Sequence, residues 1–183
     1  MAALGEIIVQ YDGEYVLTRE GSRDFGEVPR IISDGKEIPA GVIRLRTGKH
    51  KDEPGNYGEK HIERAGRFQE LMDNGYHNAR DLVEDVARNY NAIYPGKFAP
   101  LMLVKQGTER DTLICVELTH GDNGKYYDVR TGFISRKGYT KNKTPLWVSP
   151  NSDVNTESVA AHYPQRKTSP RAITGNPDTI SML

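Results

Sequence analysis

The chain has 183 residues, of which 25 are basic and 25 acidic, so its formal net charge is +0. This length suits one folded domain with appendages, and the balanced charge excludes a global field that would drive the protein onto nucleic acid or an anionic membrane. The single cysteine, in the apolar run TLICVEL, excludes an intrachain disulfide or a cysteine-rich zinc site. No stretch resembles a membrane span or a secretion signal, so we expect a cytoplasmic protein with no signal peptide and no membrane partner.

Residues 1–39 are expected to form an N-terminal hairpin and a connector. The segment IIVQYDGEYVLT alternates around Asp12-Gly13, a dipeptide that supplies the positive φ angles of a two-residue hairpin turn. The following segment, GSRDFGEVPRIISDGKEIPAG, is broken by glycines and prolines, which disfavour regular structure. We interpret it as a connector that packs along the core.

A strand and two helices are predicted next, in a domain that covers residues 40–150. The segment GVIRLR indicates a strand, and the polar loop TGKHKDEPGN follows it. A first helix is predicted over residues 58–73, with one stripe at i, i+4 and i+7 spacing. The residues of this stripe are His61, Ala65, Phe68 and Met72. Asn78 is a suitable N-cap for a second helix, ARDLVEDVARNY, whose apolar residues repeat along one face.

Four strands are predicted in the second half of the chain, namely APLMLVKQG, DTLICVELTH, KYYDVRTGFIS and PLWVS. Strands in succession build an antiparallel meander. Residues 151–183 contain many prolines, serines and threonines and few large apolar side chains, which predicts a flexible polar tail. The predicted fold class is therefore α+β, with two helices packed on one face of a four- or five-stranded antiparallel sheet.

A candidate site combines one histidine with several cations. His61 lies in the first turn of the predicted helix, just after a strand that carries Arg44 and Arg46, and a later strand carries Arg130 and Thr131. RNA can be cleaved without a metal because its own 2′-hydroxyl attacks the adjacent phosphate. The protein then has only to move protons and to stabilise charge. Imidazole, with an ordinary pKa of about 6.5, suits the first task, and arginine suits the second.

RNA-binding residues are expected beside this site. The segment SRKGYTKNKTPLW concentrates cations without an acid and supplies two aromatic rings, which together can follow a phosphate backbone and stack bases. The predicted RNA-binding residues are Arg46, Lys49, Arg136, Lys137, Tyr139 and Lys141. A solvated strand face for Arg44 and Arg46, an ordinary strand residue for Thr131 and a solvated cationic loop are the alternative interpretations.

The remaining histidines do not indicate a metal site. They are His50 in a loop, His77 at a turn, His120 at a strand end and His162 in the tail. No pair of them has the spacing of a helical zinc motif. We therefore expect a protein without a metal or another cofactor.

Three short pieces occur in an order known from one superfamily of nucleases. They are IRLRTG (residues 43–48), GEKHI (58–62) and TGF (131–133), with EDVARNYNAIY as a helix between the last two. Over residues 24–150 the chain resembles the phage- and prophage-associated barnase–EndoU–colicin–RelE-like (BECR) nucleases, in particular barnase/colicin-like endoribonucleases. Members commonly have a second histidine one turn after the first. Ala65 occupies that position here, so the resemblance implies a vacant catalytic position, natural or engineered.

The residues and the resemblance together predict a metal-independent endoribonuclease that acts as a toxin or effector module. Its catalytic residues would be His61, Arg44, Arg130 and Thr131. RNA, with tRNA as one candidate, would be the substrate, and an immunity or antitoxin protein would neutralise the activity. Two alternatives stay open: a catalytically degenerate module that binds RNA or a protein, and a nucleotide-using transferase such as an ADP-ribosylating toxin.

Overall fold

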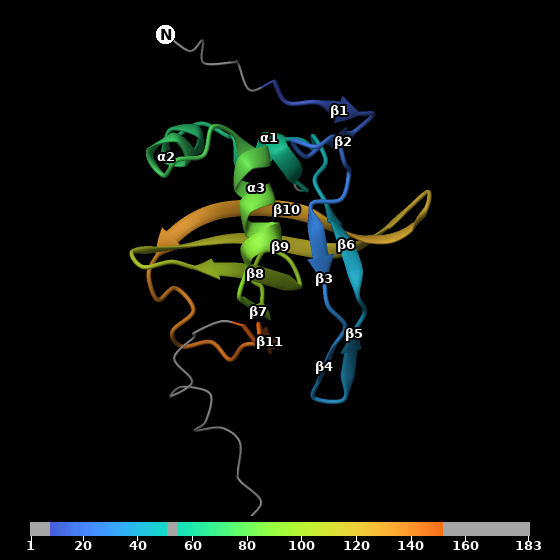
Figure 1. The fold of residues 1–183 in the computed structure, drawn as a ribbon, viewed down its shortest axis with the longest axis vertical. Helices are drawn as coiled ribbons and strands as arrows, with labels where there is room; N and C mark the ends of the chain where they lie inside the picture. The colour runs from blue at the N-terminus through green and yellow to red at the C-terminus, as the bar shows by residue number, and fades with distance from the viewer. Residues whose placement is uncertain (1–7, 51–54, 152–183) are drawn as a thin grey trace, which may run out of the picture. The chain divides into compact units, whose positions relative to one another are not determined.

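A seven-stranded mixed sheet forms the centre of the described chain (Figure 1). The computed structural model describes residues 8–50 and 55–151. Three helices lie in this part, namely α1 (Gly58–Ile62), α2 (Arg67–Asp73) and α3 (Ala79–Asn89). The predicted α+β class is confirmed, but the number of elements is larger than predicted. All but the first residue of the predicted tail, 151–183, lies outside the described residues, so its flexibility stays a prediction.

The order of strands in the sheet is β11-β7-β8-β9-β10-β6-β3. Four of them form an antiparallel meander: β7 (Ala92–Pro95), β8 (Leu101–Gln106), β9 (Arg110–Gly121) and β10 (Gly124–Arg136). Strands β8, β9 and β10 are the first three of the four predicted strands, whereas β7 was not predicted. The last strand, β11 (Trp147–Val148), does not extend this meander but returns to pair with β7 at its far edge.

The expectation of a purely antiparallel sheet is wrong at β10. Strand β6 (Gly41–Arg44) pairs with β10 in parallel, and β3 (Gly26–Val28) then pairs with β6 in antiparallel orientation. Parallel strands need a long connection, and the chain between β6 and β10 contains all three helices and three strands of the meander. The early strands therefore complete a sheet whose other half comes from much later in the sequence.

The predicted N-terminal hairpin is present. Its strands are β1 (Tyr11–Asp12) and β2 (Tyr15–Val16), and Gly13 in the turn has a φ of +59°. The expected irregular connector is wrong, because it contains β3 and a second hairpin. The strands of that hairpin are β4 (Ile31–Ser33) and β5 (Lys36–Ile38). Asp34 and Gly35, which join them, both have positive φ, as in the preferred two-residue turn.

Residues on both sides of the predicted boundary at residue 40 share one core. Val16, Phe25 and Val28 are fully buried with Ile43 of β6 and with the apolar face of α3. The described residues, 8–50 and 55–151, accordingly belong to one compact unit. The segment before residue 40 thus supplies part of the core against which the candidate site is built.

The helix predicted over residues 58–73 is divided in two. The break lies at Gly66, which caps α2 with a φ of +83°, a conformation that is not helical. The predicted stripe is not buried, since Phe68 is 47% and Met72 is 45% exposed. The helix at residues 79–90 is confirmed as α3, and the backbone N–H of Asp81 donates to the side-chain oxygen of Asn78 at 2.9 Å.

The piece EDVARNYNAIY is only partly helical, because α3 ends at Asn89 and Ala92–Pro95 form β7. Two glycines bring α3 close to the sheet. A Cβ atom at Gly26 would lie 2.5 Å from the carbonyl oxygen of Ala87, and one at Gly132 would lie 2.8 Å from Cδ2 of Leu82. Gly132 is the middle residue of the TGF piece. The close packing of β10 against α3 explains why this position holds a glycine.

Candidate active site

A pocket of about 440 Å³, here called the His61 pocket, lies where α1 and the start of α2 face β10. Three kinds of side chain line it. The lining cations are Arg64, Arg67 and Arg130, the polar groups include His61 and Thr131, and the aromatic rings are Phe98, Phe133 and Tyr139. No Asp or Glu belongs to the described lining of this pocket. His61, Arg130 and Thr131, which the sequence analysis proposed as catalytic, are thus brought together.

An irregularity in β10 brings Arg130 and Thr131 to the same pocket. Neighbouring residues of a regular strand point to opposite faces of a sheet. Between β10 and β9 the register shifts from the pair Val129–Val116 to the pair Thr131–Cys115, so Arg130 is the extra residue of a β-bulge. Bulges redirect side chains and are frequent beside active sites. The TGF piece therefore contributes Thr131 and Phe133 to the lining, and the bulge adds Arg130.

The second imidazole beside His61 comes from His50, a residue that the sequence analysis set aside. The Nδ1 atoms of the two rings lie 3.2 Å apart, and their centroids 5.4 Å. Ala65, in contrast, lies exposed in the turn between α1 and α2, because α1 ends at Ile62. The expected i, i+4 relation between residues 61 and 65 is therefore wrong for this chain. The second histidine is therefore brought next to His61 by the loop that carries His50, and not by the next turn of a helix.

The loop that carries His50 is closed by backbone hydrogen bonds. The N–H groups of Lys49 and Tyr57 donate to each other's carbonyl oxygens at 3.0 and 3.1 Å. Gly48 permits this closure, since its φ is +65° and an added Cβ would lie 1.9 Å from the carbonyl oxygen of Tyr57. The polar loop TGKHKDEPGN gave no sequence signal for this contact, because the bonds join main-chain atoms.

The ring of Tyr57 is contacted by two guanidinium groups. The Cζ atoms of Arg46 and Arg130 lie 4.4 and 4.7 Å from its centroid. Both arginines contact Asp128, whose side chain is fully buried: Arg46 donates to its two oxygens at 3.1 and 2.6 Å, and Arg130 at 3.3 Å. Arg46 is thus part of the support beneath the pocket and does not line it. Arg130 has both roles.

His61 is surrounded by positive charge. Burial and the nearby charges of Arg64, His50, Arg67 and Arg130 lower the pKa of His61 from 6.5 to about 4. At neutral pH the ring is uncharged. Nη1 of Arg64 lies 3.3 Å from Nε2 of His61, and a guanidinium only donates. Nε2 is therefore the acceptor, and Nδ1–H of His61 donates toward Nδ1 of His50.

The three arginines of the pocket differ in their partners. Arg67 pairs with Glu70 at 3.1 Å, and Arg130 pairs with Asp128 and, at 3.6 Å, with Glu117. Arg64 donates to the backbone oxygen of His61 at 2.6 Å. Among the residues described by the structure it forms no ion pair with a carboxylate. Its guanidinium therefore has donors left for an anion in the pocket.

The other predicted site residues lie elsewhere. Arg44 pairs with Asp24 at 2.7 Å and lies over the rings of Tyr15 and Tyr126, outside the His61 pocket. Lys49 is exposed in the closed loop. Arg136 and Lys137 line a neighbouring pocket together with Tyr139, and Lys141 is exposed just beyond them.

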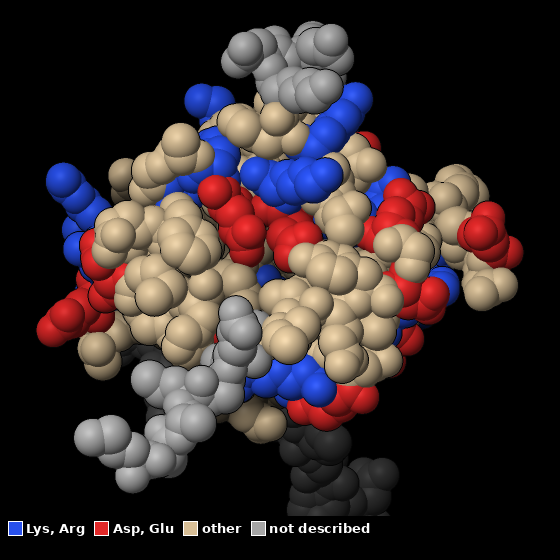
Figure 2. All heavy atoms as spheres, turned by 90° about the horizontal axis from the view of Figure 1, so that it is seen from above, with Lys and Arg blue, Asp and Glu red and all other residues tan. Residues whose placement is uncertain are grey.

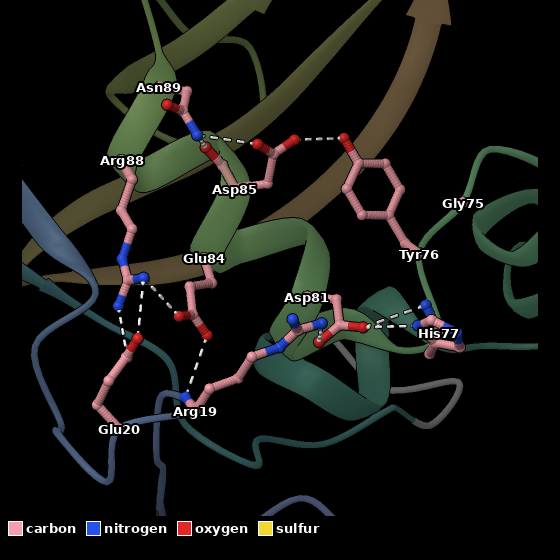
Figure 3. A pocket seen from close by; sticks show the side chains of 10 residues that line it. All are labelled: Arg19, Glu20, Gly75, Tyr76, His77, Asp81, Glu84, Asp85, Arg88 and Asn89. Carbon is pink, nitrogen blue, oxygen red and sulfur yellow. Dashed lines mark hydrogen bonds and ion pairs between the residues drawn. The ribbon is translucent and has the colours of Figure 1, made fainter. Parts of the chain in front are cut away.

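A second pocket holds charges that are mutually paired (Figure 3). This paired-charge pocket lies along the polar face of α3 and contains His77. Asp81 accepts from His77 and pairs with Arg19, both at 3.1 Å. Burial would raise the pKa of Asp81, but its hydrogen bonds to Arg19, Arg80 and His77 outweigh burial and lower it. Arg88 pairs in turn with Glu20 and Glu84.

Positive and negative side chains are interspersed over the face seen from above (Figure 2). Within residues 8–50 and 55–151, no group of three or more His, Cys, Asp or Glu side chains converges as a set of metal ligands. No described helix is long and apolar enough to cross a membrane.

No family model, curated protein or solved structure matches the chain.

Proposed function

We propose that the chain is an endoribonuclease that cleaves RNA in the His61 pocket without a metal. One observation carries this proposal: an uncharged imidazole lies beside Arg64, a guanidinium without a carboxylate partner among the described residues. An imidazole and three guanidinium groups suit an anion and a proton transfer, whereas a metal site would need a third His, Cys, Asp or Glu ligand beside His50 and His61, and the described residues supply none.

In the proposed reaction, the bridging phosphate takes the donors of Arg64 and Arg130, which frees Nε2 of His61. This atom accepts the proton of the 2′-hydroxyl while the 2′-oxygen attacks phosphorus. The bond between phosphorus and the 5′-oxygen breaks. His61 passes its Nδ1 proton to Nδ1 of His50, which lies 3.2 Å away, and the leaving oxygen receives the Nε2 proton of His50. Both rings end the step uncharged, each as the opposite tautomer. The products are a 2′,3′-cyclic phosphate and a 5′-hydroxyl. Thr131 donates a hydrogen bond to a non-bridging oxygen.

The biological role that we propose is that of a toxin or effector that cleaves cellular RNA, tRNA included, and is neutralised by a dedicated protein. This part rests on the resemblance to BECR nucleases, whose pieces include His61, Thr131 and Phe133. The structure supports it to the extent that these three residues line one pocket. Arg44, the fourth residue proposed as catalytic, pairs with Asp24 instead and is left out of the mechanism.

The proposal is tested by incubating labelled RNA with the full chain in the presence of EDTA. We expect cleavage, products that end in a 2′,3′-cyclic phosphate, and no cleavage of DNA of the same sequence. Growth inhibition on expression should disappear with His61→Ala. Cleavage that needs a divalent ion would refute the mechanism. RNA binding without any cleavage would indicate the degenerate binding module instead.

A further inference from the structure

A third pocket, of about 520 Å³, shares the side chain of Tyr139 with the His61 pocket. We call it the Arg136 pocket. Its lining includes Arg110, Arg136 and Lys137, and Tyr139 lines both pockets. The one acid among the described lining residues is Glu70, whose carboxylate is engaged by Arg67 at 3.1 Å. Two cationic pockets therefore share one aromatic wall.

The charges of the Arg136 pocket are arranged unfavourably for the protein alone. Arg110 and Arg136 are directly opposite each other in the β9–β10 register. Like charges at such positions destabilise a strand pair. Neither arginine forms an ion pair with a carboxylate in the part of the chain that the structure describes. An anion between them would relieve the repulsion, so the pocket is complementary to a phosphate.

The loop that carries Tyr139 is held in place by a buried carboxylate. Asp111 is 2% exposed, and one of its oxygens accepts from the backbone N–H of Gly138 at 3.2 Å. The N–H of Tyr139 donates to the carbonyl oxygen of Arg136, also at 3.2 Å. Tyr139 is thus fixed between the pockets, with 37% of its surface exposed.

Tyr139 belongs to a row of three aromatic rings. Phe133 contacts Tyr139 edge to face with a centroid distance of 5.9 Å and Phe98 with 6.2 Å. Phe98 is 59% exposed. Exposed rings stack on unpaired bases, whereas the bases of a duplex already stack on one another. The row therefore favours a single strand.

We propose that RNA binds as a single strand that runs from the His61 pocket past Tyr139 into the Arg136 pocket. This inference rests on the proposed function and deepens it. The scissile phosphate lies beside His61, a base stacks on the aromatic row, and the next phosphates contact Arg110, Arg136 and Lys137. A dinucleotide is too short to reach the second set of cations, so longer single strands bind more tightly.

The test measures binding of 2′-O-methyl oligonucleotides, which lack the attacking hydroxyl and cannot be cleaved by this route. Fluorescence anisotropy compares a dinucleotide, a single-stranded octamer and a duplex of the same sequence on the full chain. The double variant Arg136→Ala/Lys137→Ala is matched by Lys36→Ala/Lys125→Ala, which removes the same charge from exposed sites on β5 and β10. Tyr139→Ala tests the stacking.

We expect the octamer to bind more tightly than the dinucleotide and the duplex. The Arg136/Lys137 variant should weaken octamer binding only, and should reduce its slope of log K against log salt by about 1.4, or 0.7 for each lost phosphate contact. Tyr139→Ala should weaken octamer binding roughly 5- to 160-fold. The Lys36/Lys125 control should leave octamer binding unchanged.

Equal affinity for the duplex and the single strand would contradict the proposed single-strand path. So would a loss of octamer affinity in the Lys36/Lys125 control equal to that in the Arg136/Lys137 variant. Tighter binding of a polyglutamate peptide than of the octamer would assign the surface to an acidic protein and would also overturn it. Because these ligands cannot be cleaved, the result is independent of the reaction. If the binding pattern holds while unmodified RNA is not cleaved, the single-strand path stands and the nuclease proposal fails.

Discussion

The His61 pocket and the paired-charge pocket both contain a histidine and several arginines, and they differ in how those charges are satisfied. In the paired-charge pocket His77 contacts a carboxylate, and Arg19 and Arg88 have carboxylate partners. In the His61 pocket the imidazole is next to cations, and Arg64 has no carboxylate partner among the described residues. A histidine and arginines in a cleft are thus not enough to indicate a ligand. Charges that the protein leaves unbalanced are the better sign.

The largest expected effect distinguishes His61 from His77. His61→Ala should lower the rate of RNA cleavage by about 10²–10⁴-fold, because it removes the group that accepts the 2′-hydroxyl proton. His77→Ala should leave the rate unchanged, since its ring contacts Asp81 in the other pocket. His50→Ala should lower the rate through loss of the second imidazole. A steady-state cleavage assay measures these rates. A wild-type rate in His61→Ala would show that RNA is cleaved at another site.

A buried carboxylate supports each pocket, and replacing it should separate stability from activity. Asp128→Asn leaves Arg46 and Arg130 without their shared anion and should lower the free energy of unfolding by about 3–5 kcal/mol. It should also reduce cleavage, because Arg130 lines the His61 pocket. Asp81→Asn should lower stability but not the activity of the folded fraction. Urea unfolding and cleavage rates, measured on both variants, give the two readouts.

The lowered pKa of His61 predicts how pH acts on activity and stability. A base with a pKa of about 4 keeps kcat/KM high at pH 5, whereas an ordinary imidazole would already be largely protonated. Between about pH 4 and 6.5 the unfolded chain binds more protons at this residue than the folded chain. The contribution of His61 to the free energy of unfolding therefore rises with pH in that window. His61→Ala should flatten this part of the stability profile.

The cause of that shift can be tested one charge at a time. Arg64→Gln should raise the pKa of His61, because the charge of Arg64 is the largest effect after burial. NMR titration of the His61 ring measures the change directly. Arg88→Gln, in the paired-charge pocket, is the matched control and should leave the titration of His61 where it is. An unchanged pKa in Arg64→Gln would mean that burial alone accounts for the shift.

The smallest expected effect concerns Ala65. Because this residue lies in an exposed turn outside α1, Ala65→His should not place an imidazole beside His61 as a helix would. We expect cleavage to stay at the wild-type rate, while His50→Ala lowers it. A large gain with Ala65→His would show that the turn rearranges and that position 65 is the vacant catalytic position implied by the resemblance.

The sequence predicted the elements that depend on local patterns. The cap at Asn78, the apolar face of α3, the first hairpin and the first three strands of the predicted meander follow from short-range signals and are present. The divided helix carried a visible warning, since Gly66 interrupts it. The second hairpin did as well, because Asp34-Gly35 is a preferred turn dipeptide. In both cases the sequence contained a short turn signal, but the prediction followed a longer pattern. For the helix this pattern was the stripe over residues 58–73, and for the hairpin it was a segment broken by glycines and prolines.

Other features depend on contacts that no local pattern encodes. The pairing of β6 with β10 joins residues more than eighty positions apart, as in the partners Ile43 and Tyr127. The approach of His50 to His61 depends on main-chain bonds that close a loop. The bulge at Arg130 depends on the register between two strands. The sequence therefore identified four lining residues of the site, namely His61, Arg130, Thr131 and Tyr139, but not the second histidine or the role of Asp128.

The late position of β10 has a consequence for how the protein is made. His50 and His61 leave the ribosome early, but Arg130 and Thr131 belong to a strand that ends only at Arg136. A nascent chain that stops before β10 contains both imidazoles and lacks the floor on which they would face a phosphate. For a ribonuclease, the message being translated is the nearest potential substrate. The order of the strands along the chain delays assembly of the pocket until most of the polypeptide has been synthesised.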